Sequence, residues 1–385
     1  MERITRRGFV GTAGAVAAGA WLPSAAAGAG ALPAPDGDRT VHLAGDGLGL
    51  TPRDYAVLLA ELTARAEIGE DSYLLGGEIE RFERHWATLL GKETAVFMPS
   101  GTLANQLALR ALAGSRRRVI VPEISHIYND TGDACQTLSG LTLLPLAPGT
   151  ATFTRADVDA VLARTAGGRV ATEVGAIAIE SPIRRLSGQM FDWKELPAIA
   201  ALARDRNIGL HLDGARLFIA SAYTGRSPAD LAAPFDTVYV SLWKYFNCGV
   251  GAILAGPRRV LDGMFHTRRM FGGNLAVGWP AALVARHYMD GFVDRLTRAV
   301  EVSEGFYRAI GAHPRVAVER ITNGTNLTRL TFKGVDASAV ARRLGERGVR
   351  MPAPSPAGVV TLGVNESWTR TTSRDLVAAF EQALG

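Results

Sequence analysis

Cysteine is scarce in this sequence: Cys135 and Cys248 are the only two, and they form neither a CxxC pair nor a Cys/His spacing typical of a metal site. The seven histidines contain no HExxH arrangement. The residues therefore give no support to metal catalysis. They leave open whether the two cysteines form a disulfide.

Clustered basic residues with interleaved aromatics are missing as well. The net charge is +5, of which three arginines and one glutamate in the first 27 residues contribute +2 and the remainder about +3. We interpret Arg116-Arg117-Arg118 as a solvated turn. The glycine pattern Gly8-x-x-Gly11-x-x-Gly14 lacks the preceding strand that a nucleotide loop requires. We therefore expect no nucleic-acid partner, and a nucleotide-dependent α/β enzyme is disfavoured.

Long apolar runs that could cross a membrane are missing after the amino terminus. The terminus itself carries a twin-arginine pattern, Thr5-Arg6-Arg7-Gly8-Phe9-Val10, then a Gly/Ala-rich apolar stretch and a small-residue cleavage site, Ala25-Ala26-Ala27. We expect residues 1–27 to be a signal peptide that exports the folded chain to the periplasm or beyond. The alternative is a membrane anchor helix, and the sequence does not decide whether the leader is cleaved.

The remaining pattern predicts an α/β protein with a second, smaller domain. Residues 28–38 read as a linker. Helical stretches separate several strand-like runs, at 94–98, 118–122, 142–146, 174–179, 207–212, 236–242 and 250–255. This alternation predicts a mainly parallel sheet between helices, in a large domain over 39–275. A smaller α+β domain is predicted over 276–385, from a helical stretch at 279–311, strands at 315–319, 326–332 and 358–364, and helices at 336–347 and 373–384.

Two polar side chains follow apolar runs that read as buried strands, Asp213 after Asn207-Ile208-Gly209-Leu210 and Lys244 after Thr237–Leu242. The carboxyl ends of neighbouring strands meet over one crevice in such a sheet. An amine there can form an imine with an aldehyde cofactor, and an acid can keep a ring nitrogen protonated, as pyridoxal phosphate chemistry requires. Strand-end Asp and Lys residues are also commonly just solvated or ion-paired.

Two further motifs follow strands. Ser100-Gly101-Thr102 opens a helix after the 94–98 strand, where free N–H groups, hydroxyls and the helix dipole suit an anion, although simple helix capping explains it too. His126 follows the 118–122 strand, where an imidazole can stack on a flat ring or move protons.

These motifs together resemble the threonine aldolase/aromatic amino acid β-eliminating lyase family, pyridoxal phosphate enzymes of fold type I. The resemblance covers about residues 40–280 and rests on seven segments in order: Gly69–Tyr73, Leu89–Glu93, Pro99–Asn105, Ser125–Tyr128, Leu212–Arg216, Ser241–Lys244 and Gly272-Gly273.

The resemblance implies a role for each matching residue. Lys244 would carry the cofactor, Asp213 would pair with its ring nitrogen, Ser100, Gly101 and Thr102 would hold its phosphate, and His126 would stack on its ring. Arg216 would bind the substrate carboxylate, and Tyr73 would lie near the cofactor, with a neighbouring subunit as its possible source. Because the family works as dimers or tetramers with shared active sites, a homodimer or homotetramer is implied.

The substrate half departs from the family pattern. The family's Glu-Asn-Thr-His segment aligns with Glu180-Ser181-Pro182-Ile183, so its histidine is missing. Arg184 and Arg185 follow, and one of them could recruit an acidic or bulkier substrate side chain, unless both are surface-paired. The phosphate-binding Arg expected after Gly272-Gly273 is replaced by Asn274–Val277, and Thr361 stands where a second carboxylate contact is expected.

We therefore expect a lyase that takes a small amino acid and cleaves Cα–Cβ of a β-hydroxy amino acid to glycine and an aldehyde. In that reaction His126 or a water would be the base, because Ile183 cannot serve. The alternatives are β-elimination from a β-substituted amino acid, with Lys244 removing the α-proton, and a catalytically silent protein that only binds an amino acid or a partner.

Overall fold

The computed structural model describes residues 39–65 and 67–385, so the predicted signal peptide and linker lie outside the described residues. At its centre is a seven-stranded sheet in the order β2-β8-β7-β6-β5-β3-β4. Strand β8 runs antiparallel to β2 and β7, and the other neighbouring pairs are parallel. The strands are β2 (Thr94–Met98), β3 (Arg118–Pro122), β4 (Thr142–Leu146), β5 (Val174–Glu180), β6 (Gly209–Asp213), β7 (Thr237–Ser241) and β8 (Ala252–Gly256).

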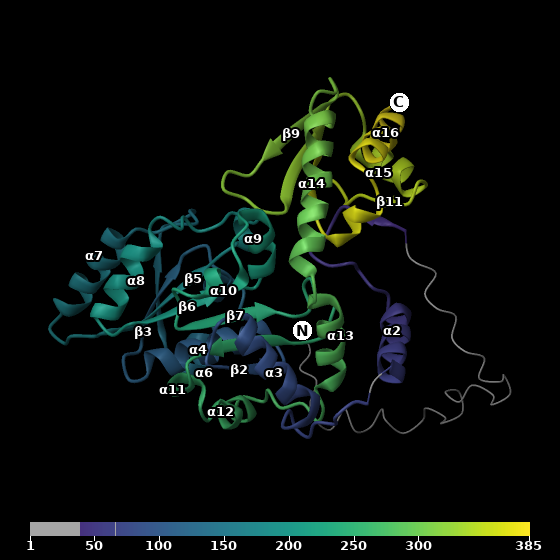
Figure 1. Ribbon diagram of the computed structural model, residues 1–385. Coiled ribbons are helices and arrows are strands. Elements are labelled where there is room, and N and C mark those ends of the chain that lie inside the picture. Colours follow the sequence, from purple (N-terminus) through teal and green to yellow (C-terminus); the bar gives the residue numbers. More distant parts are fainter. Residues whose placement is uncertain (1–38, 66) are drawn as a thin grey trace, which may run out of the picture. The chain divides into compact units, whose positions relative to one another are not determined.

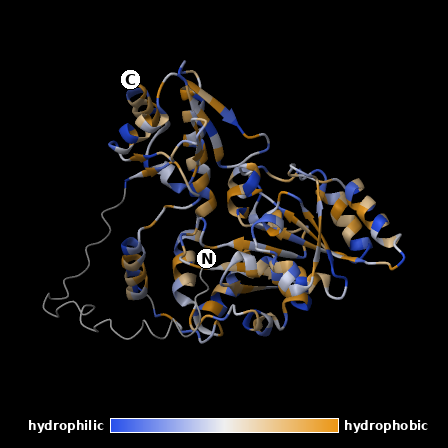
Figure 2. Ribbon diagram, turned by 180° about the vertical axis from the view of Figure 1, so that it is seen from behind, coloured by the Kyte–Doolittle hydropathy of each residue, from blue (hydrophilic) through white to orange (hydrophobic). Residues whose placement is uncertain are grey.

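Helices cover both faces of this sheet, which confirms the predicted layering. Helices α4 (Gly101–Ala113) and α6 (Ala134–Ser139) lie on one face, and α7 (Arg155–Ala166), α8 (Leu196–Asp205) and α9 (Leu217–Thr224) lie on the other (Figure 1). The strands are largely hydrophobic, whereas the helices alternate hydrophobic and hydrophilic residues (Figure 2). Buried parallel strands require such apolar runs because water reaches neither face.

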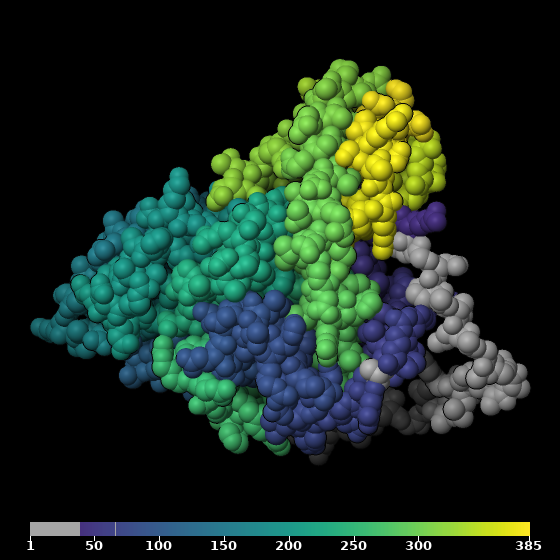
Figure 3. Space-filling view, viewed as in Figure 1, coloured from purple at the N-terminus to yellow at the C-terminus, as the bar shows by residue number. Residues whose placement is uncertain are grey.

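The carboxyl-terminal part holds a separate three-stranded antiparallel sheet in the order β12-β10-β9. Its strands are β9 (Val316–Arg320), β10 (Leu327–Phe332) and β12 (Val359–Gly363), and its helices are α15 (Ala337–Gly345) and α16 (Ser373–Leu384). Helix α14 (Phe292–Ile310) contacts both α9 and α16, and in Figure 3 its side chains run without interruption between the two parts.

The predicted helical stretch 279–311 is two helices, α13 (Trp279–Met289) and α14. Gly291 adopts a left-handed φ of 67° and breaks the helix there. The amino-terminal strand β1 (Val41–His42) pairs in parallel with β11 (Val349–Arg350), so the start of the described chain contacts its carboxyl-terminal part. The division at 275/276 stays a prediction. The remaining elements are α2 (Pro52–Arg65), α3 (Gly77–Leu89), α5 (His126–Asn129), η1 (Arg184–Leu186), α10 (Pro228–Ala232), α11 (Arg258–Leu261), α12 (Met264–Met270) and η2 (Glu366–Arg370).

Two further features bear on the sequence expectations. Cys135 and Cys248 are both buried, and neither is bridged. Across residues 39–65 and 67–385, the structure contains no helix with both the length and the apolar character of a membrane span.

Candidate active site

A cavity of about 400 Å³ opens at the carboxyl edge of the central sheet. Its lining contains every residue that the sequence predicted to hold a cofactor, together with several it did not. The lining residues are Ser100, Gly101, Thr102, His126, Glu180, Arg184, Asp213, Ala215, Arg216, Tyr239, Trp243 and Lys244. A second cavity of about 540 Å³ shares Arg216, Trp243 and Lys244 with the first. These three residues therefore lie where the two spaces meet.

Lys244 is placed by the strand before it and the aromatic core after it. It lies three residues beyond the end of β7, next to β6, which ends at Asp213. Tyr245 and Phe246 are fully buried, and their rings pack 5.2 and 5.1 Å from the ring of Phe292. Anchored in this way, the backbone holds Lys244 at the cavity with little freedom to move.

The lysine amine lies in surroundings that favour its uncharged form. Burial first, and the positive charge of Arg216 second, lower the pKa of Lys244. Its Nζ atom is 4.7 Å from the centre of the Trp243 ring. A neutral amine is the nucleophilic form, so Lys244 suits condensation with an aldehyde.

Asp213 ends a chain of buried hydrogen bonds. Asn105 Nδ2 donates to Asp213 Oδ2 at 2.6 Å, and Asn105 Oδ1 lies 2.9 Å from His211 Nε2. His211 Nδ1 lies 2.8 Å from Thr237 Oγ1. Burial lowers the pKa of His211 to about 3, so the ring is neutral and donates through Nε2 to Asn105. The Ala215 N–H also donates to Asp213 at 3.2 Å. The two donors fix the orientation of the Asp213 carboxyl group.

Ser100 is the N-cap of α4, where its side chain accepts the Leu103 N–H at 3.3 Å. Helix capping and an open amino terminus therefore coexist, and the hydroxyls of Ser100 and Thr102 line the cavity. Gly101 is required here, because a Cβ at this position would lie 2.0 Å from Tyr239 Oη. A helix amino terminus, an amine and an acid facing one space are the donor set that pyridoxal phosphate needs for its phosphate, aldehyde and ring nitrogen.

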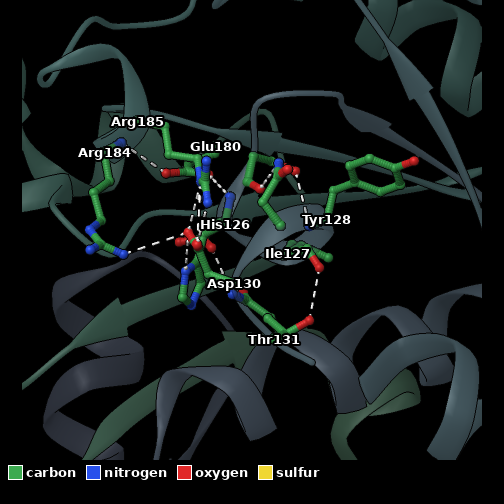
Figure 4. A network of polar contacts seen from close by, with 12 residues as sticks. His126, Ile127, Tyr128, Asp130, Thr131, Glu180, Arg184 and Arg185 are labelled. Carbon is green, nitrogen blue, oxygen red and sulfur yellow. Dashed lines mark hydrogen bonds and ion pairs between the residues drawn. The ribbon is translucent and has the colours of Figure 1, made fainter. Parts of the chain in front are cut away.

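His126 and Glu180 belong to a polar network beside the cavity (Figure 4). Glu180 Oε2 accepts the His126 N–H at 2.6 Å, and Oε1 accepts the Arg184 N–H at 3.0 Å. Asp130 lies 3.3 Å from His126 Nδ1 and pairs with Arg185 at 2.8 Å. The hydrogen bond from Arg185 lowers the pKa of Asp130.

Glu180 is a buried carboxyl with an unusual ionisation. Burial, and then the negative charge of Asp213, raise its pKa to about 8. An acid whose pKa is raised on folding stabilises the fold in its protonated form, and this contribution fades as pH rises through the folded pKa.

We expect Glu180→Gln to lower the free energy of unfolding most at low pH, because glutamine loses one of the two accepted N–H bonds. Between about pH 5 and pH 8 the difference in free energy of unfolding between the wild type and the variant should narrow, by up to about 1 kcal/mol per pH unit. In this range the folded wild-type protein keeps a proton on Glu180 that the unfolded chain releases, whereas the glutamine of the variant does not titrate. Urea unfolding of the cofactor-free protein across this range measures it. A gap that stays constant, or widens, would contradict a protonated Glu180.

Arg216 is held by a residue from the amino-terminal segment. Its Nε and Nη2 atoms both lie 2.8 Å from Asp46 Oδ2, and Asn326 from the carboxyl-terminal part donates to Asp46 Oδ1 at 3.1 Å. This pairing occupies one edge of the guanidinium, and the Nη1 side is left for a carboxylate.

Two predicted site residues do not line the cavity. Tyr73 is 51% exposed, and its ring lies 5.5 Å from the Arg269 guanidinium carbon. Arg185 points to Asp130 instead. Ile183 is fully buried, and Thr361 lies exposed on β12, so neither replaces the side chain expected at its position.

The sequence alone missed Asn105, Glu180 and Asp46. Asn105 was visible only as part of the Ser-Gly-Thr helix, one turn after the phosphate motif. Glu180 stood at a strand end like Asp213, which was a usable signal. Asp46 gave none, because its partner Arg216 lies 170 residues away.

The fold and this cavity define a class: an α/β protein with a mostly parallel sheet, in which a lysine and an aspartate at adjacent strand ends face a helix amino terminus. The Beta-eliminating lyase family profile matches residues 56–349, more than half of the chain, and the chain belongs to this family. Its fold is that of the fold type I enzymes, as the sequence predicted.

Solved structures with this fold include a putative L-allo-threonine aldolase from Listeria monocytogenes, which is 28% identical with a TM-score of 0.74 and covers 89% of this chain and 95% of that one. A putative aromatic amino acid β-eliminating lyase/threonine aldolase from Exiguobacterium sp. is 27% identical with a TM-score of 0.72, over 90% and 98%. The low-specificity L-threonine aldolase of Candida albicans is 28% identical over 64% of this chain and 65% of its own length. The match spans about half to two thirds of this and several other curated relatives.

Proposed function

We propose that this protein is a pyridoxal phosphate-dependent lyase that cleaves the Cα–Cβ bond of a β-hydroxy amino acid, giving glycine and an aldehyde. The observation that carries the proposal is the single cavity that joins Lys244, Asp213 and the Ser100–Thr102 helix terminus. Family membership and the threonine aldolases among its relatives support it.

The chain's residues divide the work of holding the cofactor. When bound, pyridoxal phosphate supplies an aldehyde that condenses with amines and a ring that accepts an electron pair. Lys244, whose pKa is lowered by burial, would offer the amine. Asp213 would hold a proton at the ring nitrogen, and the N–H groups and hydroxyls of Ser100–Thr102 would bind the phosphate.

On the substrate side, Arg216 orients the molecule through its carboxylate. This hold on the carboxylate would select which bond to the α-carbon breaks. His126 lines the same cavity and its Nδ1 lies 3.3 Å from Asp130, so its Nε2 atom or a water would take the proton of the β-hydroxyl.

The hydrogen-bond chain behind Asp213 gives a test of positioning. We expect Asn105→Leu to weaken cofactor binding and lower kcat about 10-fold, because Asp213 loses its shortest donor. Gln106→Leu is the matched control: Gln106 lies on the same helix and donates to Ser139 at 3.2 Å, away from Asp213.

The dissociation constant for pyridoxal phosphate, and for an analogue with carbon in place of the ring nitrogen, measures the effect. The loss of cofactor affinity caused by Asn105→Leu should vanish with the analogue, since the analogue has no ring nitrogen for Asp213 to pair with. An equal loss with both cofactors would assign Asn105 a purely structural role.

Incubation with L- and D-threonine, allo-threonine, phenylserine, serine and cysteine tests the function itself. Glycine with an aldehyde supports the proposal. Keto acid with ammonia would instead support β-elimination, the alternative that the family description favours. No turnover, despite bound cofactor, would support a silent binding protein.

We further propose a homodimer or homotetramer and export of the folded chain. Exposed apolar side chains gather around one backbone contact, in which the Tyr73 N–H donates to Ala276 O at 2.8 Å. Tyr73, Leu75, Met270 and Val277 are 51, 53, 73 and 47% exposed, a pattern that suits a second copy and a shared Tyr73. The export proposal rests on the twin-arginine pattern alone.

A further inference from the structure

Arg184 stands at the cavity on a turn that is fixed from two sides. Its N–H donates to Glu180 Oε1 at 3.0 Å, directly after β5. The same turn is held by the carboxyl-terminal part, because Thr325 Oγ1 donates to Gly188 O at 2.9 Å. The backbone of Arg184 is therefore fixed, whereas its side chain is 59% exposed.

The nearby carboxylate of Asp130 already binds Arg185. Arg185 binds Asp130 through Nε at 3.2 and 3.3 Å and through Nη2 at 2.8 Å. Arg184 Nη1 reaches the same carboxylate only at 3.6 Å, beyond ordinary hydrogen-bond length (Figure 4). Among residues 39–65 and 67–385, Asp130 is the acid with which Arg184 forms an ion pair.

The other cations of the cavity are accounted for. Asp46 compensates Arg216, and burial favours the neutral amine of Lys244. Glu180, with its pKa raised to about 8, is largely protonated at neutral pH and does not offset the charge of Arg184. The β5 side of the cavity is thus left with two guanidinium groups, those of Arg184 and Arg185, that share the carboxylate of Asp130.

The place of Arg184 separates it from the phosphate site. Gly101 of the Ser100–Thr102 turn packs on Tyr239 of β7, whereas Arg184 follows β5. Strand β6, with Asp213 at its end, lies between β7 and β5. An anion at Arg184 would therefore lie on the other side of Asp213 from the Ser100–Thr102 turn.

We propose that Arg184 binds a second carboxylate, so that the preferred substrates are β-hydroxy amino acids with an acidic side chain. This rests on the proposed function: Arg216 holds the α-carboxylate, and Arg184 holds the distal one. In the reaction the Cα–Cβ bond breaks, the β-hydroxyl gives up its proton and the α-carbon takes one up. The products are glycine and an oxo acid.

The holoenzyme tests this with the stereoisomers of 3-hydroxyaspartate against those of threonine. We expect higher kcat/KM on hydroxyaspartate than on threonine, and Arg184→Gln should lower the value for hydroxyaspartate about 10- to 100-fold, so that the preference over threonine is lost. Arg329→Gln is the matched control, because Arg329 donates to Ser187 of the same turn at 3.1 Å and is absent from the cavity lining. It should change neither value.

Aspartate binding, followed through the absorbance of the cofactor, gives a readout that needs no cleavage. Arg184→Gln should weaken aspartate binding by a similar factor and spare alanine. An equal loss of affinity for aspartate and alanine would mean that Arg184 binds the α-carboxylate. Unchanged affinity for both would mean that Arg184 does not bind the substrate. Either result overturns the inference. Failure to cleave any β-hydroxy amino acid would overturn the proposed function, while the aspartate titration would still judge Arg184.

Discussion

Replacing Lys244 with alanine should reduce lyase turnover by roughly three orders of magnitude or more, because no other amine from residues 39–65 and 67–385 lines the cavity. The purified variant should also lose the visible absorbance of an imine and release the cofactor on gel filtration. Steady-state kinetics and the absorbance spectrum of the native and variant proteins measure both effects.

The control for Lys244→Ala is Lys92→Ala. Lys92 is also half-buried with a lowered pKa, caused chiefly by burial, but its Nζ donates to Phe235 O and it is not among the cavity-lining residues. Its loss should affect stability alone. If Lys92→Ala removes the absorbance and Lys244→Ala keeps it, the site is misassigned.

The second large effect is expected at Asp213. Asp213→Ala removes the charge that holds a proton on the ring nitrogen, and kcat should fall about 10²- to 10³-fold. The cofactor should still attach to Lys244, so absorbance is retained while turnover is lost. This separates Asp213 from Lys244, whose loss removes both.

Asp213→Glu serves as the comparison, since it keeps the carboxylate and should recover part of the rate. A reaction that proceeds unchanged in Asp213→Ala would show that ring protonation is not needed. The mechanism would then rest on Lys244 and Arg216 alone.

The sheet could be predicted because its central strands are buried on both faces. Such strands appear as unbroken apolar runs, and β2, β3 and β4 were expected at the same residues where they occur. The polar residues at or after the ends of β3, β6 and β7 then placed His126, Asp213 and Lys244 at the carboxyl edge of the sheet. Helix limits were less certain: the helix predicted at 336–347 is shorter in the structure, Ala337–Gly345.

The rest depends on contacts between distant segments, which carry no local pattern. The sequence alone does not show that Gly291 breaks the predicted helix 279–311, because a glycine can also lie inside a continuous helix. The pairing of Arg216 with Asp46, and the commitment of Asp130 to Arg185 rather than Arg184, are set by tertiary packing. The two arginines looked equivalent in sequence, and only the structure separates their surroundings.

The central claim is a covalent bond between Lys244 and pyridoxal phosphate, and borohydride reduction tests it most directly. Protein reconstituted with the cofactor, reduced and digested with trypsin should carry the pyridoxyl mass on the peptide that contains Lys244. Recovery of that peptide without the added mass, from protein that is folded and saturated with cofactor, would contradict the account.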